Sequence, residues 1–327
     1  MGQVGSRQEQ FWEACSFGRV WLVKQMIEEG IDVNWVSHVH DSCPIHVASQ
    51  GKPEVVKLLI ESGCAIDSLD FKKNTALHHA AMSGDSEICE LLIQSKSNIN
   101  AMNQSGWTPL INAAYWNNYA CLESLLNNNC DISIQNNDGR TAIHELCRSK
   151  STDDELLLKS LSLLIECGSS IHDKSDNDNP WDSEADFSPL MFATYHGHSK
   201  LVECLIDSGA NVNERDRNGW TCLHWAAQRC HGEIVKLLLI SGSHTEARTN
   251  RGETAQDVTN DVMIRNLINP NNLGRYPVIV SNGYVTTDDE MDEENHGTDD
   301  EEHINVSSTQ SHSFNPSSQL NSKTTEV

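Results

Sequence analysis

The chain has few basic residues and contains no long apolar run. Its 327 residues include 23 Lys and Arg against 47 Asp and Glu, which gives a net charge of −24. A nucleic-acid-binding surface needs clustered cations that displace counterions, so this composition argues against a nucleic-acid partner. No apolar run approaches the roughly 20 residues that cross a bilayer, and the start, MGQVGSRQEQ, lacks the features of a secretory signal. We therefore expect a cytoplasmic protein that meets a membrane only peripherally.

The common catalytic and metal-binding patterns are also missing. The sequence has no HExxH, P-loop, GxGxxG or Ser-His-Asp pattern. Its eleven cysteines are odd in number and include no CxxC pair, which argues against a disulfide framework and against a zinc site. The sequence predicts a protein that is not an enzyme and uses no metal or cofactor. Its cysteines are expected to be reduced and to act as small core residues.

The C-terminal part differs in composition from the rest. Leu, Ile, Val and Phe account for only 10 of the 58 residues at 270–327, where 11 acids face two bases. A segment with so few large apolar residues and so much charge of one sign cannot bury a core. Residues 269–327 are therefore predicted to be a disordered acidic tail.

A four-residue box recurs along the remaining chain. Its copies begin at Cys43, Thr75, Thr108, Thr141, Ser188, Thr221 and Thr254, at intervals of 32, 33, 33, 47, 33 and 33 residues. A Thr at the first position can cap a helix, and the Pro that often follows suits the first helical turn. A fixed period of this size predicts an array of stacked repeats, since one such unit cannot bury its apolar faces alone.

The box and the residues after it resemble the ankyrin repeat. The resemblance is carried by segments such as Thr221-Cys-Leu-His-Trp-Ala-Ala227 and Val235-Lys-Leu-Leu238. It implies an all-α solenoid of about seven helix–turn–helix units with short β-hairpin loops over residues 10–268. Residues 1–9 would then form an N-terminal segment.

One repeat, at about residues 138–186, carries an insertion. The interval of 47 equals 33 plus 14, with six extra residues between the helices and eight in the polar loop Lys174–Asp182, which contains Trp181. Loops inserted into repeat arrays often lie on the binding face. The alternative is that a surface loop is simply tolerated.

Histidine occupies the fourth box position in four repeats, as His46, His78, His144 and His224. The resemblance implies a structural role, in which each imidazole hydrogen-bonds between neighbouring repeats.

Seven aromatic residues are the candidates for partner contact. The resemblance puts them on or near the concave face of the array: Trp107, Tyr115, Trp116, Phe192, Tyr195, Trp220 and Trp225. Aromatic side chains at a surface supply much of the binding energy of protein interfaces. The alternative is that they stack on adjacent repeats and stiffen the array.

Both ends of the chain carry short signals. Met1-Gly-Gln-Val-Gly-Ser6 fits the N-myristoylation pattern, with Gly2 as the acceptor. The C-terminal Thr324-Thr-Glu-Val327 resembles the ligands of PDZ domains, which require Thr325 and Val327 at these positions.

These features favour a non-catalytic adaptor that binds other proteins through the ankyrin groove, and a PDZ-domain protein through its C-terminus. A lipid at Gly2 would tether it to a membrane. The alternative is a regulator in a transcription or ubiquitin pathway, in which the array binds a substrate or factor and the acidic tail recruits machinery.

Overall fold

The computed structural model describes residues 6–176 and 184–269, and its regular structure is helical. Gly2, Trp181, the acidic tail, Thr325 and Val327 lie outside the described residues. The helices in the described ranges are α1 (Arg7–Ser16), α2 (Val20–Glu28), α3 (Pro44–Ala48), α4 (Pro53–Glu61), α5 (Ala76–Ser83), α6 (Ser86–Gln94), α7 (Pro109–Tyr115), α8 (Tyr119–Asn127), α9 (Ala142–Cys147), α10 (Asp154–Glu166), α11 (Pro189–His196), α12 (Ser199–Asp207), α13 (Cys222–Gln228), α14 (Gly232–Ile240) and α15 (Val262–Ile268).

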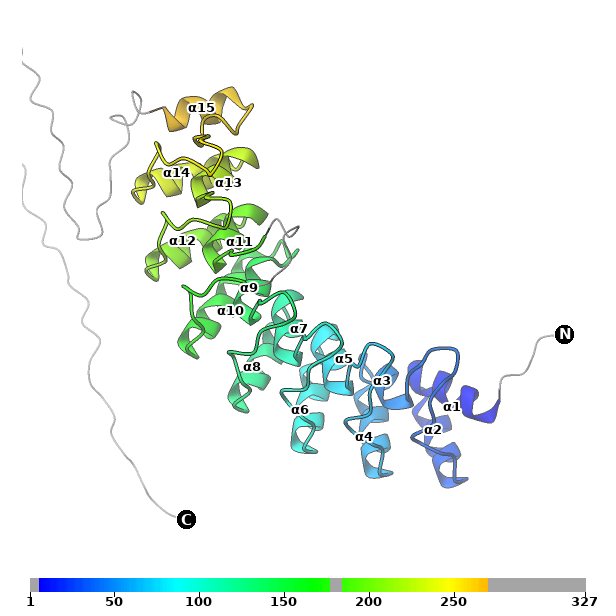
Figure 1. The fold of residues 1–327 in the computed structure, drawn as a ribbon. Coiled ribbons are helices and arrows are strands. Elements are labelled where there is room, and N and C mark those ends of the chain that lie inside the picture. The colour runs from blue at the N-terminus through cyan, green and yellow to red at the C-terminus, as the bar shows by residue number, and fades with distance from the viewer. Residues whose placement is uncertain (1–5, 177–183, 270–327) are drawn as a thin grey trace, which may run out of the picture. The chain divides into compact units, whose positions relative to one another are not determined.

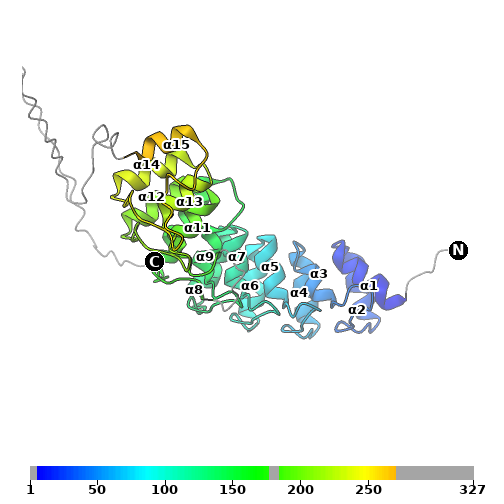
Figure 2. The ribbon, with the colours of Figure 1, turned by 45° about the horizontal axis from the view of Figure 1, so that its top comes forward.

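The helices stack in pairs along a curved array. In Figures 1 and 2 the first helix of each pair has an odd number, from α1 to α13, and these helices form the inner row of the curve. Their even-numbered partners, from α2 to α14, form the outer row. This arrangement confirms the all-α solenoid. The hairpin loops contain no regular strand within the described residues, where one isolated bridge joins Ser37 to Ser42.

Helices α1 and α15 are the first and last helices of the described array. Helix α15 ends at Ile268. Helix α1 begins at Arg7, within the range 1–9 that the sequence analysis assigns to an N-terminal segment. The Ser6 side chain accepts a hydrogen bond from the backbone N–H of Glu9 and thereby caps this helix.

The first helices of the repeats that follow α2 begin directly after their box residues, as α3, α5, α7, α9, α11 and α13. The Thr108 hydroxyl accepts a hydrogen bond from the N–H of Ile111 at 3.2 Å, and Pro109 occupies the first helical position. The Thr108 hydroxyl pairs one of the N–H groups that a helix start leaves without a partner, and Pro109 has no N–H group that would need one. The local sequence therefore determines where the helix begins.

The box histidines join consecutive repeats. The Nδ1 atom of His78 accepts a hydrogen bond from the N–H of Thr75, so Nε2 carries the proton and donates to the carbonyl of Trp107 at 2.9 Å. His144 makes the equivalent bond to Asp173. The same bridges start at His46 and His224, which confirms the structural role of all four imidazoles.

Asparagine side chains add a second kind of link between neighbouring repeats at three places along the array. The Oδ1 atom of Asn34 accepts a hydrogen bond from the N–H of Ala65 at 2.7 Å, which lies one repeat further on. Asn100 and Asn213 make the corresponding bonds to the repeats that follow them. Neighbouring repeats are therefore held together by polar bonds at two levels as well as by their apolar contacts.

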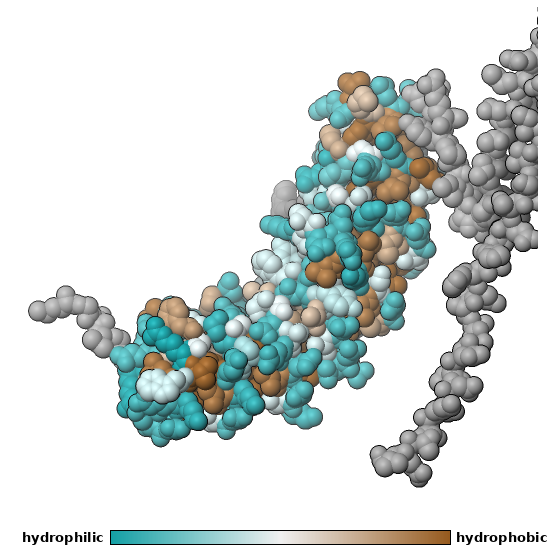
Figure 3. Space-filling view, turned by 180° about the vertical axis from the view of Figure 1, so that it is seen from behind, coloured by the Kyte–Doolittle hydropathy of each residue, from teal (hydrophilic) through white to brown (hydrophobic). Residues whose placement is uncertain are grey.

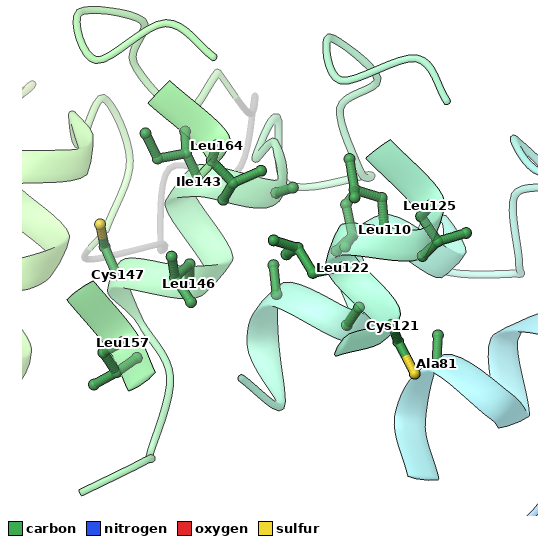
Figure 4. Close-up of a cluster of buried hydrophobic side chains, with 14 of the residues drawn as sticks. Ala81, Leu110, Cys121, Leu122, Leu125, Ile143, Leu146, Cys147, Leu157 and Leu164 are labelled. Carbon is green, nitrogen blue, oxygen red and sulfur yellow. The ribbon is translucent and has the colours of Figure 1, made fainter. Parts of the chain in front are cut away.

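The core is a continuous apolar layer between the helix pairs. Figure 4 shows Leu122 and Leu125 of α8 packed with Leu110 of α7, and all three are buried. Cys121 points its sulfur toward α5, where it lies 3.7 Å from the carbonyl oxygen of Ala80. Eight of the eleven cysteines are buried in this way, which confirms their use as small core residues.

The insertion alters one helix and one loop. Helix α10 has 13 residues, whereas the second helix of the preceding repeat, α8, has nine. Four of the six extra residues therefore extend α10, and the other two lengthen the turn before it. Only part of the inserted hairpin loop is described, because the described residues stop at Asp176 and resume at Glu184.

We expect the array to lose stability in mild acid because of its bridging histidines. Burial lowers the pKa of His78 and His144 to about 4, whereas an unfolded chain has a His pKa of about 6.5. The neutral imidazole is therefore favoured by folding, so its stabilisation is complete above about pH 6.5 and is lost as the pH falls toward about 4. Each of these two residues should contribute up to about 3 kcal/mol over that range.

Urea unfolding at several pH values measures this effect. His144→Asn should make the free energy of unfolding less dependent on pH than in the wild type, and His38→Asn at an exposed position is the matched control. A wild-type free energy of unfolding that is equal at about pH 7 and about pH 5 would contradict the prediction.

Candidate partner-binding surface

The seven aromatic candidates form two separate groups. In the first group the ring of Tyr115 lies between two indoles, with ring centroids 5.3 Å from Trp107 and 5.4 Å from Trp116. Tyr115 and Trp107 are half-buried, while Trp116 is 54% exposed. Tyr115 is the last residue of α7, Trp116 follows it and Trp107 lies in the loop before it. Helix α7 belongs to the inner row of the array (Figure 1).

The second group joins α11 and α13 and the loops before them. The Trp220 and Trp225 rings lie 4.3 Å apart, and Tyr195 meets Trp225 edge to face at 5.3 Å. Phe187 is at the centre, within 6 Å of Phe192, Tyr195 and Trp225. The rings therefore stack on one another between repeats, and Tyr195 and Trp220 remain half-exposed at the edge.

Two of the seven candidates cannot contact a partner in this conformation. Phe192 has no exposed surface and Trp225 is 7% exposed, so the expectation that they contribute to a binding surface is wrong. Phe192 lies between neighbouring first helices, with its ring 5.8 Å from that of His144 in α9. Trp107, Tyr115, Trp116, Tyr195 and Trp220 remain as candidates.

Trp225 is fixed by its indole N–H as well as by its ring contacts. The Nε1 atom donates a hydrogen bond to the Asp216 carboxylate at 3.1 Å. Burial raises the pKa of Asp216, although the carboxylate also accepts hydrogen bonds from the N–H groups of Trp220 and Asn218. Trp225 is therefore the support on which the half-exposed Trp220 and Tyr195 rest.

Sequence reasoning missed two members of this group. The Arg229 guanidinium lies 4.4 Å from the centre of the Tyr195 ring, a cation–π contact across two repeats that no local pattern indicates. Phe187 immediately precedes its box, as Trp107 and Trp220 precede theirs. That shared register was the signal that could have identified it.

A cluster of buried charges lies beside the aromatic group. Arg140 is 3% exposed and its guanidinium lies 3.1 Å from the Glu184 carboxylate, which also receives Arg148 at 3.0 Å. Glu145 is fully buried and pairs with Arg148 at 3.1 Å. Glu184 follows the inserted loop, so these ion pairs attach the end of the insertion to the residues on either side of α9.

The two carboxylates of this cluster respond differently to their surroundings. Burial raises the pKa of Glu145, because the nearby charges of Arg148 and Arg140 do not fully compensate for lost solvation. Burial also acts to raise the pKa of Glu184, but the contact with His196 and the two guanidinium charges outweigh it, and the pKa is lowered.

Within residues 6–176 and 184–269, no three His, Cys, Asp or Glu side chains gather as they would around a metal ion. In the same part of the chain, no helix is both long and apolar enough to cross a membrane. The back of the array in Figure 3 is mainly hydrophilic, with separate apolar patches.

The family assignment follows from the fold together with the sequence match. The family model for ankyrin repeats (three copies) matches residues 11–103, 80–175 and 157–249, which is more than half of the chain. The chain belongs to the ankyrin-repeat family, whose repeats generally form protein-binding modules.

Individual proteins that contain ankyrin repeats resemble part of this chain. Ankyrin repeat domain-containing protein 40 of Mus musculus is 42% identical over 80 residues, which are 24% of this chain and 22% of that protein. The ankyrin repeat domain of human ASB11 superimposes with a TM-score of 0.59 at 21% identity, covering 69% of this chain and 96% of the other. That of Bcl-3 gives 0.56 at 24% identity, with coverages of 70% and 99%. These two likenesses show the fold alone.

We expect truncation of Trp225 to destabilise the fold far more than truncation of Trp116. Trp225→Ala should reduce the free energy of unfolding by about 3–5 kcal/mol, because it removes a buried ring and the indole N–H that donates to the Oδ2 atom of Asp216. Trp116→Ala should change it by less than about 0.5 kcal/mol, since that ring is largely exposed. Urea unfolding measures both, and equal losses in the two variants would contradict the assignment of Trp225 as the support.

Proposed function

We propose that this protein is a non-catalytic adaptor that binds other proteins through the inner face of its ankyrin array. The observation that carries the proposal is the edge of the second aromatic group, where Tyr195 and Trp220 are half-exposed and Arg229 covers the Tyr195 ring. Trp, Tyr and Arg are the residues most enriched among the energetically dominant positions of protein interfaces.

The rigidity of this edge supports the same function. Tyr195 and Trp220 both contact Trp225, which is held by Asp216. Side chains that are already ordered lose little conformational entropy when a partner binds, so more of the contact energy remains as affinity. Trp116, with Tyr115 and Trp107, forms a second contact region on the same row of helices.

The proposal includes attachment to a membrane through the two ends of the chain. A myristoyl group on Gly2 binds a bilayer only marginally, and stable attachment takes a second signal. A PDZ partner at a membrane scaffold would supply it by binding the Val327 carboxylate and Thr325 as an added strand. Two weak attachments on one chain act together through effective concentration.

Partner binding is tested by quantitative mass spectrometry of proteins recovered with the full chain. Tyr195→Ala and Trp220→Ala should each lower the affinity for a specific partner by about 30-fold, the effect of a typical interface hot spot. Less of that partner should then be recovered. Trp21→Ala, at an exposed position on the first repeat, is the matched control. Proteins recovered equally with all four chains would refute binding at this edge, provided that the helical spectra agree.

Membrane attachment is tested by fractionation of cells. Gly2→Ala and Thr325→Ala should each release part of the protein from the membrane fraction, and the double variant should release nearly all of it. Thr324→Ala, one residue outside the required position, should leave the distribution unchanged. A wild type that is entirely in the soluble fraction, with an unmodified Gly2 by intact mass, would eliminate this part of the proposal.

A further inference from the structure

One position of the hairpin loop changes its chemistry along the array. In each loop a backbone N–H donates to the carbonyl of the residue before the box, as Asp216 does to Trp220 and Thr249 does to Glu253. The residue preceding that donor is equivalent from repeat to repeat. In order along the chain it is Val36, Leu69, Met102, Gln135, Lys174, Arg215 and Arg248. The position is therefore apolar in the first three loops and cationic in the last three.

The three cations are linked to one another through backbone carbonyls. The Lys174 ammonium donates to the carbonyl of Arg215 at 2.8 Å, and the Arg215 guanidinium donates to the carbonyl of Arg248. Arg248 in turn donates to the carbonyl of Gly252 at 2.7 Å. We call Lys174, Arg215 and Arg248 the cationic ladder.

These bonds orient the cations through neutral carbonyl groups, although the Asp257 carboxylate also interacts electrostatically with Arg248. No carboxylate among the described residues forms an ion pair with any member of the ladder, although Glu214 and Glu246 lie on the same loops. By contrast, the nearby Arg217 pairs with Asp186 at 3.4 Å. An Arg side chain has five N–H donors, so Arg215 and Arg248, both exposed, retain donors for a ligand.

The spacing of the ladder is fixed by bonds between consecutive loops. The N–H of Asn250 donates to the carbonyl of Asn218 at 2.9 Å, and the Asn250 side chain donates to the carbonyl of Arg217 at 3.0 Å. Adjacent loops therefore cannot shift independently. A ligand that matches the spacing meets cations that are already in position, which reduces the entropy lost on binding.

We propose that the cationic ladder binds a short acidic peptide segment of a partner protein, whose Asp or Glu side chains accept hydrogen bonds from Lys174, Arg215 and Arg248. This inference rests on the proposed protein-binding function and names the class of partner. Carboxylates are the complementary groups, because Arg binds them through two parallel N–H donors. A nucleic acid is a poorer match, since its phosphates need more cations than this row supplies and the whole chain carries −24.

Fluorescence polarisation with the full-length protein tests the proposal. The probe is a short fluorescein-labelled peptide of alternating Glu and Ser, and its counterpart with Lys in place of Glu is the negative probe. Arg215→Gln and Arg248→Gln should each weaken binding by about threefold, and the triple variant with Lys174→Gln by about 20-fold. Binding should also weaken as salt is raised, because exposed charges are screened.

Matched variants separate the ladder from general charge effects. Leu69→Gln and Met102→Gln change the same loop position in earlier repeats, and Lys57→Gln removes a positive charge from the outer helix α4, so all three should bind the Glu–Ser peptide as the wild type does. Arg215→Lys should retain most of the binding. Circular dichroism of each variant confirms that the helices remain folded.

The outcomes distinguish this inference from the proposed function. A triple variant that binds the Glu–Ser peptide within about twofold of the wild type would overturn the ladder. So would equal weakening by Lys57→Gln, or a single-stranded DNA oligonucleotide that binds more tightly than the peptide. Trp220→Ala should leave peptide binding intact, so loss of partners in that variant tests the aromatic edge alone.

Discussion

The hydrogen bond from a box histidine to the next repeat is the interaction on which the rest of the structure depends. It satisfies the N–H at the start of its own helix and a carbonyl of the following loop with one buried ring, so a single residue fixes both the helix start and the spacing between repeats. Where Ile111 replaces the histidine, Thr108 caps the helix through its hydroxyl and the Asn100 bridge still joins the repeats. The apolar layer supplies most of the stabilisation, but apolar contacts are not directional and do not fix how neighbouring repeats are placed. The hydrogen bonds between repeats fix that placement.

Most of the fold was predictable from the sequence because its determinants are local and repeat. A Thr or Ser before an apolar helix and a His three residues later recur at a fixed period, and each occurrence is independent evidence for the same unit. The burial of Phe192 and Trp225 was not predictable in this way. Whether a ring on a first helix faces solvent or the next repeat depends on a rotation of a few tens of degrees, and the period does not specify it. The contact of Arg229 with Tyr195 and that of Glu184 with Arg140 join residues more than 30 positions apart, which no local pattern indicates.

The charged cluster and the aromatic group meet at the Phe192 ring, over which Arg140 lies at 5.3 Å. Burying these guanidinium and carboxylate groups costs solvation energy that their attraction does little more than offset. Glu184 lies beyond the insertion and pairs with both arginines, so these contacts hold that part of the chain against the residues on either side of α9. Tyr195 contacts Phe187 of the aromatic group, with ring centroids 5.9 Å apart.

The extra length of α10 also indicates which insertions the array can accept. Four added residues make about one full turn of helix, so the residues beyond the insertion keep their orientation and the same apolar face meets its neighbours. Two added residues would rotate that face by roughly half a turn and direct it into water. In this array, lengthening by whole turns is thus nearly neutral for packing, while shorter insertions are confined to loops. The repeat built on α9 and α10 is the natural place to graft additional sequence without disturbing the modules on either side.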